Sequence, residues 1–214
     1  MYSSYTAACF ARKHDLADRH GVNFAGALTW AFTFEDQPYF AGFRQLASCG
    51  LPLPVFNVFR MFSLMNGQRI AAESDGAVSL DDIIRRGVRE KPDIGGLASS
   101  ETNKVCVMIW HYHDDDVSGP DSQIKLALAG LPAMANEAKL THYRVDASHS
   151  NAYDEWRRMG SPIAPDQRQY RRLQDASNLA KLAEAPASIK VQGGVAEFEF
   201  ILPRQGVSLA IAEW

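Results

Sequence analysis

Residues 27–36 constrain the possible folds of this chain more than any other part of the sequence does. An apolar run leads into an aromatic cluster that begins at Trp30, and two adjacent carboxylates, Glu35 and Asp36, follow. Aromatic faces can stack on a sugar ring, and carboxylates accept hydrogen bonds from sugar hydroxyls. The pattern is typical of a strand that leaves the core of a (β/α)8 barrel and enters a sugar-binding site.

The composition excludes several classes of protein. The 214 residues carry a net charge of −3, with 46% hydrophobic and 22% charged residues, so no basic surface for nucleic acid or a membrane is expected. Cys9, Cys49 and Cys106 form no CxxC pair, which predicts buried thiols and neither disulfides nor a zinc site. No apolar run reaches the ~18 residues of a membrane helix, and the first residues lack the pattern of a secretory signal. We therefore expect a cytoplasmic protein.

The first 67 residues have the sequence pattern of an α/β unit. Residues 3–20 predict a helix with a buried stripe, which Gly21 ends. Residues 22–30 predict a short buried strand. Residues 54–66 predict a second helix, which is apolar nearly all round and is therefore expected to be buried on most sides.

From residue 68 the pattern changes to short strands separated by turn residues. Several of these runs alternate between apolar and polar residues, which predicts an antiparallel β-sandwich. The predicted strands are 69–73, 105–112, 124–128, 140–145, 195–202 and 207–212. Two helices interrupt them, at 151–159 and at 165–183, the second with Pro165 in its first turn. The chain is thus predicted to divide into residues 1–67 and residues 68–214.

Several segments, in order along nearly the whole chain, resemble the C-terminal part of glycoside hydrolase family 39, the family of β-xylosidases and α-L-iduronidase. The bacterial β-xylosidases are the most similar members. The segments that carry the resemblance are 28–36, 38–44, 54–62, 107–112, 149–162 and 202–207.

The resemblance implies a fold and a chemistry. Members have a (β/α)8 barrel with a β-sandwich packed on it, and they hydrolyse glycosides with retention, through one glutamate on barrel strand 4 and another on strand 7. It places residues 1–67 at helix 7, strand 8 and helix 8 of the barrel, and residues 68–214 in the β-sandwich. Both catalytic glutamates would then lie outside this sequence. We therefore expect no catalytic residue and no hydrolysis by this chain alone.

The resemblance also implies a ligand. With the rest of a barrel present, the partner would be a xylo-oligosaccharide or another small glycoside, and no cofactor is expected. Two alternatives stay open. The chain could be a non-catalytic β-sandwich module that binds carbohydrate or a partner protein, or a truncated product with no function of its own.

Four residues are the candidates for substrate binding. The resemblance places Trp30 at the floor of the sugar site, and Glu35 and Asp36 among the acids that bond sugar hydroxyls. Arg44 corresponds to an arginine that reads a uronate in α-L-iduronidase. From the residues alone, Trp30 could equally be a core aromatic, the two acids a solvated loop, and Arg44 a surface residue.

Two further clusters carry charge. His111 and His113 share one face of a strand and are followed by Asp114, Asp115 and Asp116, which is a spacing that a metal site could use. We interpret them instead as a solvated acidic turn beside partly buried histidines, with weak calcium binding as the alternative. The Asp154–Arg158 cluster and the arginines at 168, 171 and 172 are interpreted as solvated helix faces or contacts to the barrel.

Overall fold

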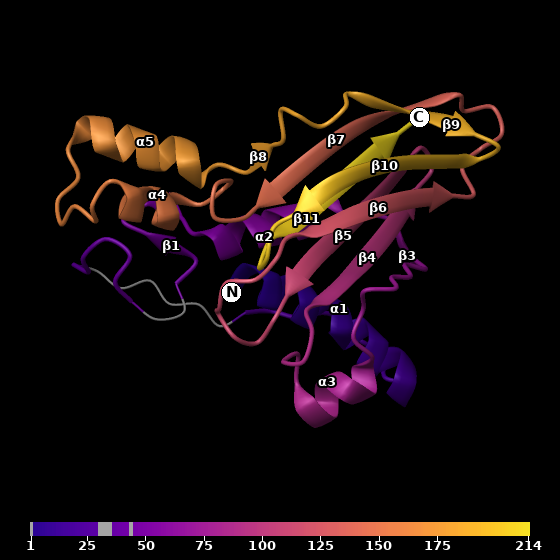
Figure 1. Cartoon of the computed structure of the whole chain (residues 1–214), viewed down its shortest axis with the longest axis horizontal. Coiled ribbons are helices and arrows are strands. Elements are labelled where there is room, and N and C mark those ends of the chain that lie inside the picture. The colour runs from indigo at the N-terminus through magenta and orange to yellow at the C-terminus, as the bar shows by residue number, and fades with distance from the viewer. Residues whose placement is uncertain (1, 30–35, 43–44) are drawn as a thin grey trace.

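The computed structural model describes residues 2–29, 36–42 and 45–214 (Figure 1). The chain begins with α1 (Tyr2–His20), which confirms the helix predicted over 3–20. Ala7, Ala8 and Ala11 are buried on one side of α1, because residues three and four apart share a helix face. Gly21 follows with a φ of 60°, a left-handed conformation that favours glycine at the end of a helix.

The segment after α1 does not form the strand that the sequence predicts. Residues 22–29 form no strand, and Val22 and Leu28 are 58% and 81% exposed. A strand of a closed barrel is hydrogen-bonded to a neighbour on each side, and no strand of the described chain pairs with these residues. The prediction of a buried strand over 22–30 is therefore wrong for residues 22–29, and residue 30 lies outside the described residues.

The second predicted helix is α2 (Pro54–Leu64). A small hairpin of β1 (Ala47–Ser48) and β2 (Leu51–Pro52) precedes it. Val55, Val58 and Met61 of α2 are buried, but its phenylalanines are only half-buried. The expected burial on most sides is thus found on one face, which packs towards α1 and the large sheet.

The rest of the chain is dominated by one antiparallel sheet. Its strands follow the order β3-β4-β5-β11-β7-β9-β10-β6, with β8 beside β7. Their bounds are β3 (Gln68–Ile70), β4 (Asp93–Glu101), β5 (Lys104–Tyr112), β6 (Ser122–Ala129), β7 (Glu137–Val145), β8 (Ala180–Lys181), β9 (Ser188–Gln192), β10 (Val195–Leu202) and β11 (Val207–Glu213). The six predicted strands are all present, and 195–202 has the predicted bounds. β4 and β9 were not predicted.

The sheet curls, and apolar side chains fill both of its faces. On β5, Cys106, Met108 and Trp110 face α1 and α2, while Val107 and Ile109 face the inside of the curl. There they meet residues of β6, β9 and β10, such as Leu128, Ile189 and Phe198. This double burial explains why β5 is an unbroken apolar run rather than an alternating one.

Three short helices complete the fold: α3 (Leu80–Arg86), α4 (Ala152–Arg158) and α5 (Gln167–Ser177). α4 and α5 pack together at one end of the molecule (Figure 1). Pro165 precedes the cap of α5 and does not stand in its first turn, because Asp166 and Gln169 form a capping box. α5 also ends six residues earlier than predicted, because Ala180–Lys181 pairs with β7 instead. Within the described residues, the helices are too short or too polar to cross a lipid bilayer.

Candidate functional site

Of the four candidate substrate-binding residues, one lies within the described structure. Trp30, Glu35 and Arg44 lie outside the described residues. Asp36 is exposed and has a φ of 53°, a left-handed conformation that aspartate adopts more readily than most residues. The structure therefore places one carboxylate of the predicted sugar-binding stretch at the protein surface, and the roles of all four residues stay predictions.

The chain that follows Asp36 runs onto α4 and α5. The ring of Phe40 lies 5.7 Å from that of Tyr153 and 5.2 Å from that of Trp156, both on α4. The N–H of Phe40 donates to Oγ of Ser48 over 2.7 Å, which fixes this turn to the β1–β2 hairpin. These contacts hold the end of the predicted sugar-binding stretch against α4.

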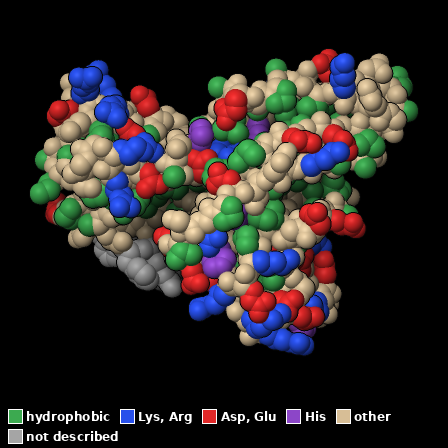
Figure 2. Space-filling view, viewed as in Figure 1, with side chains coloured by type: hydrophobic (Ala, Val, Ile, Leu, Met, Phe, Trp, Pro, Cys, Tyr) green, Lys and Arg blue, Asp and Glu red, His purple; other side chains and the backbone are tan. Residues whose placement is uncertain are grey.

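A groove of about 830 Å³ opens beside Phe40. Its walls come from segments that are far apart in the sequence: α1 at Ser3, the turn before α2, the loop 116–121, the end of β7, α4 and the turn 203–205. Figure 2 shows the surface dip between the lobe of α4 and α5 and the curled sheet. The groove is thus a concave surface that begins four residues after the predicted sugar-binding stretch, at Phe40.

The wall at the end of β7 is a buried network of charges. The carboxylate of Asp146 accepts hydrogen bonds from the backbone N–H of Ser148 and of His149, over 2.7 and 2.8 Å. Nδ1 of His149 also lies 2.9 Å from this carboxylate, and Nη1 of Arg144 lies 3.4 Å from it. Arg144 in turn donates to Oγ of Ser208 over 2.8 Å. Because Arg144 and two backbone N–H groups compensate its charge, Asp146 shapes the groove rather than attracting ions.

Other charges around the groove are less compensated. Within the described chain, Nε of Arg204 is buried and has no hydrogen-bond partner, and its guanidinium lies against Gly119. Asp116 and Asp121 of the loop 116–121 also line the groove, as do Asp154 and Arg157 of α4. Groups of both signs, together with aromatic rings, suit a polar, uncharged ligand that donates and accepts hydrogen bonds.

The sequence did not identify these groove residues as functional. Segments 149–162 and 202–207 were noted only because they resemble family 39. Asp154 and Arg157 were noted only as part of a charge cluster. No local pattern in the sequence could have related them to Phe40, because this ring meets α4 only in the folded chain. The resemblance of these segments to family 39 was the one feature of the sequence that indicated a function for them.

Several of the histidines and acids at 111–116 form hydrogen bonds within the protein. Nε2 of His113 lies 2.9 Å from the carbonyl oxygen of Arg89, and its Nδ1 accepts from the N–H of Asp115 over 3.0 Å. Asp114 accepts from the hydroxyl of Tyr112 and from the N–H of Val88. Burial lowers the pKa of His111. In the part of the chain that is described, no three His, Cys, Asp or Glu side chains are placed to share a metal ion.

The sequence matches the model of the glycosyl hydrolases family 39 over residues 2–196. The chain belongs to this family. The match runs from α1 into β10, so it includes the predicted sugar-binding stretch and the groove walls up to Arg157, whereas the turn 203–205 lies beyond it. The predicted resemblance to family 39 is therefore confirmed.

Two curated proteins are similar in sequence to this chain. A β-xylosidase of Caldicellulosiruptor saccharolyticus is 28% identical over 161 residues, which are 71% of this chain and 29% of that enzyme. The α-L-iduronidase of Mus musculus is 26% identical over 148 residues, which are 65% of this chain and 22% of that enzyme. The chain thus spans less than a third of the length of the curated relatives that it matches.

Solved structures of family 39 share the fold. The enzyme from Xanthomonas axonopodis pv. citri aligns with a TM-score of 0.60 and 16% identity, over 77% of this chain and 31% of that one. A β-xylosidase from Caulobacter crescentus aligns with a TM-score of 0.59 and 18% identity, over 79% of this chain and 32% of that one. At these identities the likeness shows the fold alone: a curled antiparallel β-domain with few helices, as in family 39.

Proposed function

We propose that this chain is part of a β-xylosidase-like glycosidase and that its segment 27–54 forms one side of the sugar site. The observation that carries the proposal is the family match over residues 2–196, which covers that segment. Phe40, which belongs to the segment, lines the groove. The similarity to a β-xylosidase supports xylosides as the substrate class. Trp30, Glu35, Asp36 and Arg44 would contact the sugar.

We further propose that the 214 residues do not hydrolyse xylosides on their own. Retaining hydrolysis needs two carboxyl groups about 5 Å apart on either side of the scissile bond, and the resemblance places both on other strands of a parallel barrel. Every strand pair of the described chain is antiparallel. Most of residues 22–29 also lie exposed, as expected of a barrel segment that lacks its neighbours.

The division near residue 67 is part of the same proposal. Residues 1–67 would complete a catalytic barrel, and residues 68–214 would form its β-sandwich. The apolar cluster enclosed between the two halves of the curled sheet supports a sandwich. The second cluster, which α1 and α2 share with the outer face of the sheet, supports a close contact between the two parts.

A chimeric enzyme tests this function. This chain replaces the matching 29% of the Caldicellulosiruptor β-xylosidase, and hydrolysis of p-nitrophenyl β-xyloside is measured. We expect turnover by the chimera and none by the 214-residue chain alone. A Trp30→Ala chimera should lose at least about tenfold in kcat/KM. Turnover by the isolated chain that Glu35→Ala abolishes would refute the proposal that the chain is inactive alone, and a folded chimera that cleaves only α-L-iduronides would refute the substrate class.

The groove also favours a second function, a non-catalytic module that binds carbohydrate. A concave wall that combines Phe40 and Tyr153 with polar side chains does not need a catalytic pair to hold a sugar. One measurement distinguishes the two functions. A non-catalytic module binds glycans as the isolated chain, whether or not the chimera is active.

A further inference from the structure

Three aromatic rings cluster at one wall of the groove, and two of them, Phe40 and Tyr153, line it. Tyr153 and Trp156 lie 6.0 Å apart on α4, and Phe40 packs against both. The indole N–H of Trp156 donates to the carbonyl of Pro162 over 2.9 Å, which fixes the position of that ring. Tyr153 is 39% exposed and lines the groove, so part of its ring is open to a ligand. Since Phe40 and Trp156 both contact this ring, little conformational entropy would be lost when a ligand stacks on it.

Polar groups of fixed position surround this ring. Nδ2 of Asn151 donates to Asp154 over 2.8 Å and to the carbonyl of Asp146 over 3.0 Å, which orients the Asp154 carboxylate at the groove. The guanidinium of Arg157 lies 6.0 Å from the centre of the Tyr153 ring. Tyr153, Asp154 and Arg157 thus present a ring face, an acceptor and a donor on one short helix.

The two arginines at the end of α4 differ in their surroundings. Arg158 forms an ion pair with Glu155, which also pairs with Arg172 of α5. Within the described residues Arg157 pairs with no carboxylate, and it faces the groove. The outer side of α4 is therefore neutralised within the protein, whereas Arg157 keeps its donors for a ligand.

We propose that this groove is a binding subsite for a neutral oligosaccharide, with one pyranose ring stacked on Tyr153 and its hydroxyls bonded to Asp154 and Arg157. A polyanion would meet the carboxylates of Asp116, Asp121 and Asp154, and a polycation would meet Arg157 and Arg204. Sugar hydroxyls both donate and accept, so they can satisfy groups of either sign. The choice of a β-1,4-linked xylose chain rests on the proposed function, whereas the position of the subsite rests on the groove.

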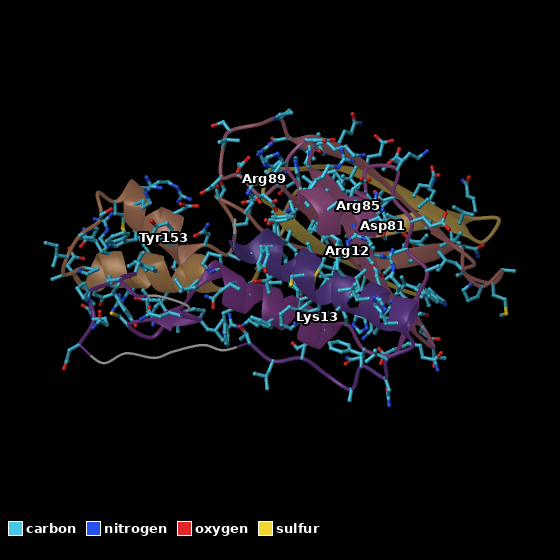
Figure 3. All side chains as sticks on the ribbon, turned by 90° about the horizontal axis from the view of Figure 1, so that it is seen from below. Arg12, Lys13, Asp81, Arg85, Arg89 and Tyr153 are labelled. Atoms are coloured by element: carbon cyan, nitrogen blue, oxygen red, sulfur yellow. The ribbon has the colours of Figure 1, made fainter. Side chains whose placement is uncertain are left out.

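Figure 3 shows Tyr153 at the α4 end of the molecule, away from Arg12 on α1 and from Asp81 and Arg85 on α3. The subsite is therefore separate from the charged surface around α3. Its proposed sugar contacts, Tyr153, Asp154 and Arg157, are different residues from the four proposed to contact the reacting sugar, and they belong to α4. A chain of several sugars that leaves the groove at Phe40 would approach Asp36, which lies four residues away.

The test is a titration of the 214-residue chain with xylohexaose, followed by calorimetry and by tryptophan fluorescence. We expect millimolar or tighter affinity, with Tyr153→Ala and Arg157→Ala each weakening it about tenfold, the worth of one ring stack or one charged hydrogen bond. Tyr153→Phe should keep the affinity, because the ring face remains. The matched controls are Arg158→Ala, which alters the adjacent arginine, and Tyr5→Ala, which removes an exposed tyrosine of α1 outside the groove.

Three outcomes would overturn the subsite: no binding at millimolar xylohexaose, equal affinity of the wild type and both alanine variants, or binding of heparin in place of the neutral sugar. Circular dichroism of each variant separates lost binding from lost folding, and Tyr153→Phe tests the stack in a protein of nearly unchanged packing. An inactive chimera with intact xylohexaose binding would refute the catalytic proposal alone. An active chimera without this binding would refute the subsite alone.

Discussion

Nη2 of Arg12 on α1 lies 3.0 Å from the fully buried carboxylate of Asp93, the first residue of β4. The same carboxylate accepts from the indole N–H of Trp110 over 2.8 Å and from the N–H of Val78 over 2.8 Å. Three donors from three parts of the chain therefore meet one carboxylate. This junction joins the N-terminal helix to the sheet, and Figure 3 shows Arg12 on α1 near α3.

The first prediction concerns this ion pair. Arg12→Met should lower the free energy of unfolding by about 3–5 kcal/mol, because it leaves a buried carboxylate without its cation. Urea denaturation measures the loss. Arg19→Met is the control, since the Arg19–Asp81 pair is exposed on both sides and should contribute less than about 1 kcal/mol. Equal losses in the two variants would show that Arg12 does not compensate Asp93.

Gly95 of β4 gives a second prediction. A Cβ at this position would lie 2.5 Å from Cζ2 of Trp110, whose ring is buried and hydrogen-bonded. Gly95→Ala should therefore destabilise the protein by about 1–3 kcal/mol through overpacking. At Gly26 an added Cβ meets nothing within 4 Å, so Gly26→Ala should leave the melting temperature unchanged. A neutral Gly95→Ala would mean that the Trp110 ring can move.

Asn57 connects α2 with the α4–α5 lobe, which gives the third prediction. Its Nδ2 donates to the carbonyls of Ser150 and Ser177, over 3.0 and 2.9 Å, and the residue is fully buried. Asn57→Leu leaves both carbonyls unpaired and should cost about 2–4 kcal/mol. Hydrogen exchange should rise at α4 and α5 more than in the sheet. A uniform rise over the whole chain would contradict the local role.

His142 predicts how stability depends on pH. Burial between Phe198 and Phe200 lowers its pKa to about 3. An unfolded histidine titrates near pH 6.5, so between these values the unfolded chain binds more protons than the folded one. The free energy of unfolding contributed by this group is complete above pH 6.5 and falls by about 1.4 kcal/mol per pH unit towards pH 3.

His142→Phe removes this titration and keeps an aromatic ring beside Phe198 and Phe200. We expect the variant to gain stability relative to the wild type as the pH falls from 7 to 4.5, measured by urea denaturation at each pH. Parallel stability curves for the two proteins would contradict the lowered pKa. The comparison isolates His142, because the other acidic and basic groups are the same in both proteins.

Strands with a regular pattern could be predicted from the sequence, whereas others could not. Residues 195–202 alternate as Glu197-Phe198-Glu199-Phe200, and they form β10 with the predicted bounds. β4 escaped prediction because it contains two adjacent glycines and starts with an aspartate, which are rare in strands. Its Gly95 is needed against Trp110, and its Asp93 is compensated by a residue 81 positions earlier.

The candidate site likewise has a part that the sequence indicated and a part that only the structure revealed. The resemblance pointed to family 39 and to the sugar-binding stretch around Asp36, and the family match confirms the first of these. The groove residues Tyr153, Asp154 and Arg157 stood in the sequence only as part of a helix with mixed charges. They became a candidate site once Phe40, more than a hundred residues earlier, was seen to pack on α4.

The sequence by itself determined the helices with clear ends, the alternating strands and the family of this protein, because these depend on neighbouring residues and on motifs in order. Tertiary structure decided that β11 lies between β5 and β7, that Asp93 can be buried, and that a groove opens beside Phe40. Each of these depends on contacts between residues far apart in the chain, whose energies no local pattern records.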